Sequence, residues 1–177
     1  MKWSQLKKRI EEGMADSVRG RVQIWSTRYR HSHDEEGEAW ITLDGQRIHS
    51  FGTLTYFIEH YHESQRIFAG RGSPDWLDPS QVKEYQGSLR DVDRVLAKQG
   101  VLPLCEVNRL LFAYLNTGIE AILGSENPLV KAIGLLDKRC GKRRLAGIDP
   151  SADHPLVQTM HRVRCEAEGI NKPEQKD

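Results

Sequence analysis

The chain has 177 residues, with 26 lysines and arginines against 25 aspartates and glutamates. This length suits one domain with its own core, or two small lobes that share one. The balanced charge excludes a whole-molecule field that would attract nucleic acid or an anionic membrane surface, so binding to either requires a local patch.

The cysteines and the N-terminus indicate where the protein works. Cys105, Cys140 and Cys165 are odd in number and form no Cys-x-x-Cys pattern, which excludes a paired disulfide framework and a cysteine-rich zinc site. The first residues are charged too early for a signal peptide, and no later run approaches the roughly 20 apolar residues of a membrane span. We therefore expect a soluble, cytoplasmic protein with reduced thiols, no membrane contact and no cofactor.

The first 70 residues predict a lobe of order α-β-β-β-α. Apolar residues at three- and four-residue spacing indicate a first helix over 3–14. Residues 18–52 alternate like strands and break at 34–37 and again at Asp44-Gly45, which predicts a three-stranded antiparallel meander with a tight second turn. A second helix follows Gly52, with an apolar stripe of Leu54, Phe57, Ile58, Tyr61 and Phe68. The helices before and after the meander would together cover its aliphatic face.

The rest of the chain reads as a helical lobe over 71–170. Two glycines and two prolines between Gly70 and Pro79 predict a joint between the lobes. Asp78 and Pro103 mark the starts of two helices, the second running as far as Ile122, and Pro128 and Pro155 mark two more. The predicted fold is α+β: a meander with two flanking helices, then a bundle of about four helices packed on it as one compact unit, and a frayed tail at 171–177.

The alternation of side chains along the strands predicts two different sheet faces. Val22 and Ile24 point to one face, with Ile41, Leu43 and Ile48, whereas His49 and Thr42 point to the other. That second face would also present Arg21, Trp25, Tyr29, Trp40 and Arg47. An open sheet with aromatic and guanidinium groups suits single-stranded nucleic acid, because bases stack and phosphates meet charge. Burial under the chain's own helical half is the favoured alternative, and a homodimer contact or an exposed ligand surface stay open.

A basic run is the clearest electrostatic feature. Lys131 precedes a denser group of Lys138, Arg139, Lys142, Arg143 and Arg144. We expect a helix that Gly141 ends, with the last two arginines in the turn, and a contact with nucleic acid or an acidic protein. Basic residues also favour a helix C-terminus through its dipole, and this explanation requires no partner.

Histidines and one acid form the best candidate for a metal centre. If the first strand continues far enough, His31 and His33 share a face with His49, and Glu38 lies close in the turn. Three imidazoles and a carboxylate suit zinc or another divalent ion. The alternative is an ordinary polar turn. The sequence contains no other catalytic motif, which favours a protein that is not an enzyme.

Two resemblances bear on this interpretation. The α-β-β-β-α order is similar to that of double-stranded RNA-binding domains, but Gly52-Thr53-Leu54-Thr55 carries no lysine where those domains grip phosphates. The segments KWSQLKKRIEEG, WSTRYRHSHDEEGEAWITLDGQRIHSFGT and LLDKRCGKRRL together resemble a family of small bacterial proteins of unknown function, over most of residues 1–145. That resemblance implies a bacterial cytoplasmic source and no catalytic residue.

The functional prediction is a non-enzymatic binding or regulatory protein. Its basic run, with the arginine and aromatic side of the sheet, would hold an anionic partner, of which nucleic acid is the leading candidate. The alternative from another class is a metal-dependent hydrolase or nuclease built on His31, His33, His49 and Glu38.

Overall fold

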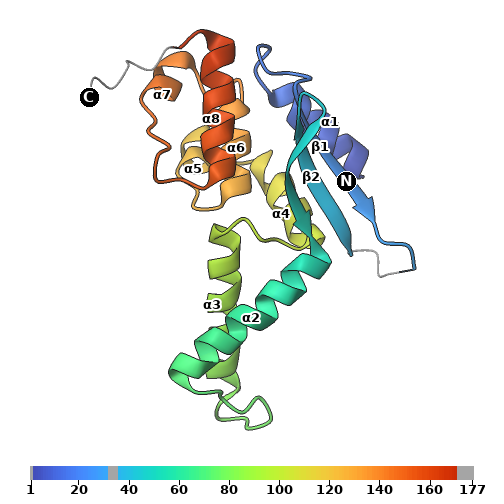
Figure 1. The fold of residues 1–177 in the computed structure, drawn as a ribbon, viewed down its shortest axis with the longest axis vertical. Helices are drawn as coiled ribbons and strands as arrows, with labels where there is room; N and C mark the ends of the chain where they lie inside the picture. Colours follow the sequence, from blue (N-terminus) through green and yellow to red (C-terminus); the bar gives the residue numbers. More distant parts are fainter. Residues whose placement is uncertain (1, 32–35, 171–177) are drawn as a thin grey trace.

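The computed structural model describes residues 2–31 and 36–170 and has the predicted α+β architecture, with one three-stranded sheet and eight helices in this part of the chain (Figure 1). The strands β1 (Val22–Arg28), β2 (Gly37–Leu43) and β3 (Gln46–Gly52) are antiparallel in the order β1-β2-β3, which confirms the meander. Asp44 and Gly45 both have left-handed backbones, with φ of 49° and 82°, so the second turn has the conformation that an Asp-Gly pair favours.

Helix α1 (Trp3–Gly13) lies beside the edge of the sheet at β1. Its residues Leu6 and Ile10 are buried, because the apolar stripe predicted from the sequence faces the core. On the same helix, the Glu11 carboxylate accepts a hydrogen bond of 3.1 Å from the backbone N–H of Ile24. The side chain therefore satisfies a strand-edge donor that would otherwise be open to pairing with another chain.

Helices α2 (Thr53–Arg71) and α3 (Val82–Lys98) form a hairpin that extends away from the sheet (Figure 1). The Tyr56 hydroxyl donates to Asp93 at 2.5 Å, and the rings of Phe68 and Tyr85 stack with centroids 5.9 Å apart. The expectation that α2 covers the sheet is wrong. Most of its predicted stripe faces solvent, because α3 packs on another side of α2, where Tyr56 contacts Asp93.

The glycine- and proline-rich segment forms the loop 72–81 between these two helices. Asp78 starts a turn there rather than α3 itself: its carboxylate accepts from the backbone N–H of Ser80 at 2.8 Å, and the helix begins at Val82. Since α2 and α3 pack on each other across this loop, the sequence break separates two elements of one hairpin. The proposed boundary between lobes of residues 1–70 and 71–170 stays a prediction.

The long helix predicted after Pro103 is divided into α4 (Leu104–Tyr114) and α5 (Ile119–Leu123). The break falls where Asn116, Thr117 and Gly118 follow one another, three weak helix formers in succession that end in a glycine. The carbonyl of Thr117, released from the helix, accepts a hydrogen bond of 2.9 Å from Arg139. The prediction of one continuous helix to Ile122 is therefore wrong.

Three further helices complete the chain: α6 (Pro128–Leu136), α7 (Lys142–Ala146) and α8 (Pro155–Glu168). Proline is the first residue of α6 and α8, as predicted, and the side chains of Asn127 and His154 cap these starts by accepting from backbone N–H groups. Six helices thus follow the loop 72–81 where about four were predicted, because α4 and α5 are separate and α7 is an additional short helix.

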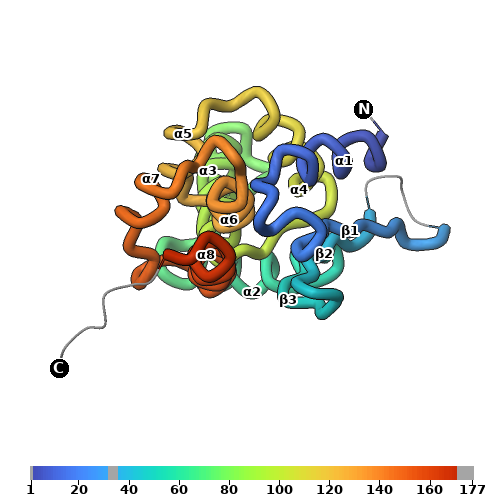
Figure 2. Tube along the Cα trace, turned by 90° about the horizontal axis from the view of Figure 1, so that it is seen from above, coloured from blue at the N-terminus to red at the C-terminus, as the bar shows by residue number. Residues whose placement is uncertain are grey.

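The core lies between one face of the sheet and the helices α4, α6 and α8, and Figure 2 shows these helices on one side of the strands. We call the covered side of the sheet the inner face and the opposite side the outer face. Gly37 illustrates the tight packing on the inner face: a Cβ there would lie 2.7 Å from a methyl group of Leu104 in α4. Helix α6 is almost entirely buried, and backbone hydrogen bonds join its end to the end of α1. Within the described residues, no helix is long and apolar enough to cross a membrane.

Candidate functional site

The outer face of the sheet carries a cross-strand pair of tryptophans. Trp25 in β1 lies directly opposite Trp40 in β2, and neighbouring residues Ile24 and Ile41 form the next pair, on the inner face. Trp25 is 40% exposed and Trp40 is half-buried. The alternation predicted for these strands is therefore confirmed for β1 and β2.

A cation lies over each of these indole rings. The Lys7 ammonium from α1 lies 3.6 Å from the Trp25 ring centroid, and the Arg47 guanidinium from β3 lies 4.2 Å from that of Trp40. The Trp25 indole N–H also donates to the Thr42 hydroxyl at 3.2 Å. These contacts hold both rings in fixed orientations, and because the Lys7 ammonium is buried and pairs with Glu11 at 3.2 Å, the Arg47 guanidinium is the accessible one of the two charges.

The favoured expectation that the helical half buries this face is wrong. Helix α4 packs on the inner face, where Val22, Ile24, Ala39, Ile41 and Phe51 form the sheet's share of the core. With that side filled by aliphatic packing, the larger and more polar outer side chains stay accessible to solvent. A second copy or a ligand remains as the alternative cover.

The other predicted residues of this face have partners of their own. Arg21 holds Asp44 with two hydrogen bonds of 3.0 and 2.8 Å at the β2–β3 turn, and Arg47 donates to Glu38 at 2.7 Å. Tyr29 is half-buried just beyond the end of β1, with its hydroxyl near Gly52. Both cations over the tryptophans, Lys7 and Arg47, therefore also have a carboxylate partner, Glu11 and Glu38.

The basic run folds differently from the prediction. Helix α6 ends at Leu136, and the segment after Gly141 starts α7, so Arg143 and Arg144 lie in a helix and not in a turn. Lys142 pairs with Glu168 at 3.1 Å, and Arg144 pairs with Glu120. Among the described residues, Lys138 and Arg143 form no ion pair, so these two contribute the charge still available to a partner.

Arg139 belongs to a partly buried network. Its guanidinium contacts Asp137, the closest distance being 2.7 Å, and the same carboxylate accepts from the Tyr114 hydroxyl. Burial alone would raise the pKa of Asp137, but the hydrogen bonds from Arg139 and Tyr114 keep that pKa below its ordinary value. Burial and the bond to Asp137 raise the pKa of Tyr114 in turn. Arg139 therefore has a structural role, because its guanidinium is already bound to Asp137.

The histidines point in different directions. A β-bulge after Ile41 pairs that residue with His49 and the next, Thr42, with Arg47, so His49 points to the inner face and the prediction that it points outward is wrong. There its Nε2 lies 3.3 Å from the Gly100 carbonyl, and its ring packs edge-on against His154 with centroids 5.3 Å apart. Burial lowers the pKa of both imidazoles.

The described residues do not assemble the predicted metal set. His31 follows the end of β1 by three residues, whereas His49 is in register with Ile24, four residues before that end. A strand rises about 3.3 Å per residue, so the four residues from Ile24 to the end of β1 alone place His31 and His49 about 13 Å apart along the strand. Glu38 pairs with Arg47, and no group of three or more possible metal ligands occurs in residues 2–31 and 36–170. His33 lies outside these residues, so the full set stays a prediction.

A cavity of about 770 Å³, which was not predicted from the sequence, lies between α1, the end of β1 and α4. Lys2, Arg28 and Arg109 line it together with Trp3, Phe112 and other residues of these elements. The Asn108 side-chain oxygen is buried there with no hydrogen-bond partner in the described part of the chain. Only the tertiary fold brings these segments together, and the sequence contains no local signal for the cavity.

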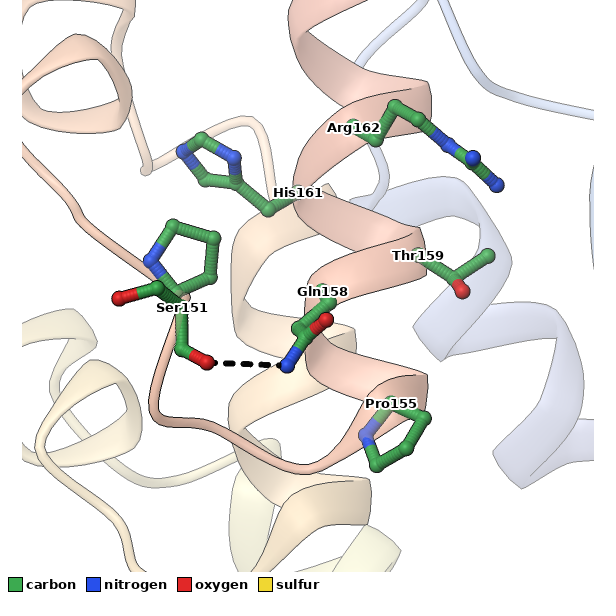
Figure 3. A pocket seen from close by; sticks show the side chains of 7 residues that line it. Ser151, Pro155, Gln158, Thr159, His161 and Arg162 are labelled. Atoms are coloured by element: carbon green, nitrogen blue, oxygen red, sulfur yellow. Dashed lines mark hydrogen bonds between the residues drawn. The ribbon is translucent and has the colours of Figure 1, made fainter.

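A smaller hollow of about 470 Å³ lies between the start of α8 and the loop before it (Figure 3). The Gln158 amide crosses it and donates to the backbone carbonyls of Ser151 and Asp153, at 3.2 and 2.8 Å. His161 lines the same hollow, but its Nε2 lies 3.1 Å from the Leu145 carbonyl. Because Gln158 and His161 are already engaged by backbone carbonyls of the protein, we interpret the hollow as part of the scaffold.

Comparisons with known proteins give one match. The model of the SF0329 protein family matches residues 2–165, which is nearly the whole chain. No curated protein and no solved structure matches. The prediction of a family of unknown function is therefore confirmed, and the chain belongs to the SF0329 protein family, a family without a described function.

Proposed function

We propose that this protein is a binding protein whose outer sheet face holds a single-stranded nucleic acid. One observation carries the proposal: the directly paired Trp25 and Trp40 lie on the sheet face opposite the core, each with a cation over its ring. Aromatic platforms with nearby positive charge bind single strands, because bases stack on the rings while phosphates meet the cations.

The geometry gives each side chain a separate task. Trp25 is the more exposed indole and offers a stacking surface for one base. Arg47 presents its planar guanidinium above Trp40, and a base can stack on the free side of such a plane. Lys7 orients the Trp25 ring and does not face a phosphate, because its ammonium is buried between that ring and Glu11, which it contacts at 3.2 Å.

Most of the predicted basic run adds little to this binding mode. Arg139, Lys142 and Arg144 already hold acidic side chains of the protein, as Arg47 holds Glu38, so a phosphate would have to compete with those carboxylates. Stacking would then dominate the affinity, with few counterions released. We expect a shallower salt dependence than that of proteins that contact 6–10 phosphates, which lose about 10³–10⁵ in affinity between 50 and 200 mM salt.

The test is a titration of the protein with single- and double-stranded oligonucleotides at two salt concentrations, followed by tryptophan fluorescence and by anisotropy of a labelled strand. Single strands should bind more tightly than duplex. Trp25→Ala should weaken binding roughly tenfold, since a stacked base contributes about 1–3 kcal/mol. Arg47→Gln should weaken binding and also reduce the salt dependence.

The matched control is Trp76→Ala, which removes another exposed tryptophan far along the chain, in the loop 72–81. It should leave the affinity unchanged. A second control, Lys138→Ala with Arg143→Ala, removes the unpaired charges of the basic run and should have a small effect. Absence of binding at low salt, or equal losses for Trp25→Ala and Trp76→Ala, would exclude the proposal.

A further inference from the structure

Helix α2 carries the largest group of exposed apolar side chains on one described element. Leu54, Phe57, Ile58 and Tyr61 are 59%, 55%, 57% and 61% exposed, and the half-buried Phe68 continues their line. We call these five residues the α2 stripe. Contiguous apolar patches of this kind on a soluble chain mark interaction surfaces, because water contact with them is unfavourable.

The position of α2 explains why the chain does not cover the stripe. The α2–α3 hairpin extends away from the sheet and from α5 to α8, and α3 packs on a neighbouring side of α2, where Phe68 at the end of the stripe stacks against Tyr85 (Figure 1). In the loop at the far end of the hairpin, Trp76 and Leu77 are also 62% and 68% exposed. One hairpin thus has apolar groups at its tip and along its free helix face.

We propose that the α2 stripe binds the same stripe of a second copy of this chain, in antiparallel orientation about a two-fold axis at Tyr61. Residues 54, 58, 61, 65 and 68 follow the alternating four- and three-residue steps of a helix-packing seam. Leu54 and Phe68 stand seven residues on either side of Tyr61, so antiparallel pairing sets Leu54 against the partner's Phe68. Tyr61 meets the partner's Tyr61, as an isologous interface requires.

The charged residues bordering the stripe are compatible with this pairing. His62 lies on one flank of the stripe, about 100° around the helix from Tyr61, whereas Glu59 lies about 200° around, on the side of α2 that faces away from the interface. Glu63 and Arg66 neutralise each other within one helix, at 2.5 Å. The stripe itself contains no charge, so closing the interface leaves no buried charge unpaired.

The area agrees with a dimer of modest stability. A large aromatic side chain buries about 150–250 Å², so side chains that are somewhat more than half exposed offer roughly 100 Å² each, or about 800 Å² for the four residues in two copies. Antiparallel pairing also carries Trp76 and Leu77 toward the base of the partner's α2. With these two residues, the total buried area approaches roughly 1,200 Å², the lower end of the range for specific interfaces.

The first test measures the molar mass of the full chain by light scattering and by sedimentation over a range of concentrations. We expect a monomer–dimer equilibrium that Tyr61→Asp shifts to monomer by at least tenfold in Kd, while circular dichroism stays unchanged because Tyr61 is exposed. The matched control is Phe112→Asp, since Phe112 is an apolar side chain on α4 that is 50% exposed. It should leave the dimer intact.

Cysteine cross-linking then tests the axis. In a Cys105→Ser background, which removes the exposed native thiol, Tyr61→Cys should form a disulfide-linked dimer under mild oxidation. Leu54→Cys alone should form no disulfide-linked dimer, and should cross-link when mixed with Phe68→Cys. A wild-type chain that is monomeric at every concentration, or a Leu54→Cys variant that cross-links to itself, would overturn the proposal.

Discussion

At the scale of single residues, the carboxylate of Asp137 is the most connected polar group in the core. It is 3% exposed and binds the Arg139 guanidinium, the Arg139 backbone N–H and the Tyr114 hydroxyl. It also follows α6 directly, where the end of α1 pairs with the chain. Asp137 thus links α1 through its backbone and α4 through its side chain to the end of α6.

Replacing Asp137 by Ala should destabilise the fold. Removal of one member of a buried ion pair costs about 3–5 kcal/mol, and we expect the lower end of that range because Arg139 is partly exposed. Urea unfolding measures the change. The control Glu120→Ala breaks the surface pair with Arg144 and should cost about 0–1 kcal/mol. Equal losses in the two variants would contradict the structural role of Asp137.

Residue-level prediction succeeded for the tryptophan pair and failed for the basic run, for one physical reason. Strand alternation is local, so Trp25 and Trp40 could be assigned to one face from the sequence. The acids that neutralise Lys142 and Arg144 are Glu168 and Glu120, more than twenty positions away along the chain. A count of charges in a short window cannot include them.

At the scale of elements, the start of α8 and the middle of β3 share two neutral histidines. His154 caps α8 by accepting the Leu156 backbone N–H on Nδ1 at 3.1 Å, which a protonated ring cannot do. His49 packs against this ring and is partly buried. Neutral imidazoles are therefore the forms that the fold selects.

Stability should fall with acid below about pH 6.5. Burial lowers the pKa of both histidines from the ordinary value of 6.5, so below that pH the unfolded chain binds more protons than the folded one. The loss continues until the pH reaches the depressed pKa values of the folded state. Urea unfolding at several pH values measures it, and His154→Asn, which keeps a capping side chain, should reduce the slope. If the slope of the unfolding free energy against pH is unchanged in this variant, protonation of His154 does not contribute to the loss of stability.

Element-level prediction was limited by which partner each apolar stripe meets. The period of the pattern identified α1, α2 and α3 correctly as helices. It could not reveal that α4, and not α2, packs on the inner face, because both carry apolar stripes. The β-bulge that turns His49 inward also has no marker in residues 46–49 that distinguishes it from regular alternation.

At the scale of the whole molecule, the α+β class follows from the order of patterns along the chain, and the structure bears it out. What the sequence could not provide is the unequal distribution of packing. Helix α6 is buried on almost every side, whereas the α2–α3 hairpin packs mainly on itself. Local stability should differ accordingly.

Hydrogen exchange can measure this difference. In the Tyr61→Asp variant, where the proposed pairing is absent, backbone amides near the tip of the α2–α3 hairpin should exchange faster than those of α6 and α8. The reason is that few buried contacts must break for the tip to open. Uniform protection across the three regions would contradict this expectation.

The joining of α1 to the end of α6 affects how the chain acquires its structure during synthesis. Ala15 and Lys138 form backbone hydrogen bonds with Leu136 and Gly13. The segment after the first helix can therefore reach its final position only when residues more than a hundred positions later are present. Helix α4, which shields the aliphatic side of the ribbon, also emerges from the ribosome well after the strands. A nascent chain of the first seventy residues would thus expose that side, and the meander gains its lasting order only after residues 104–138 have been synthesised.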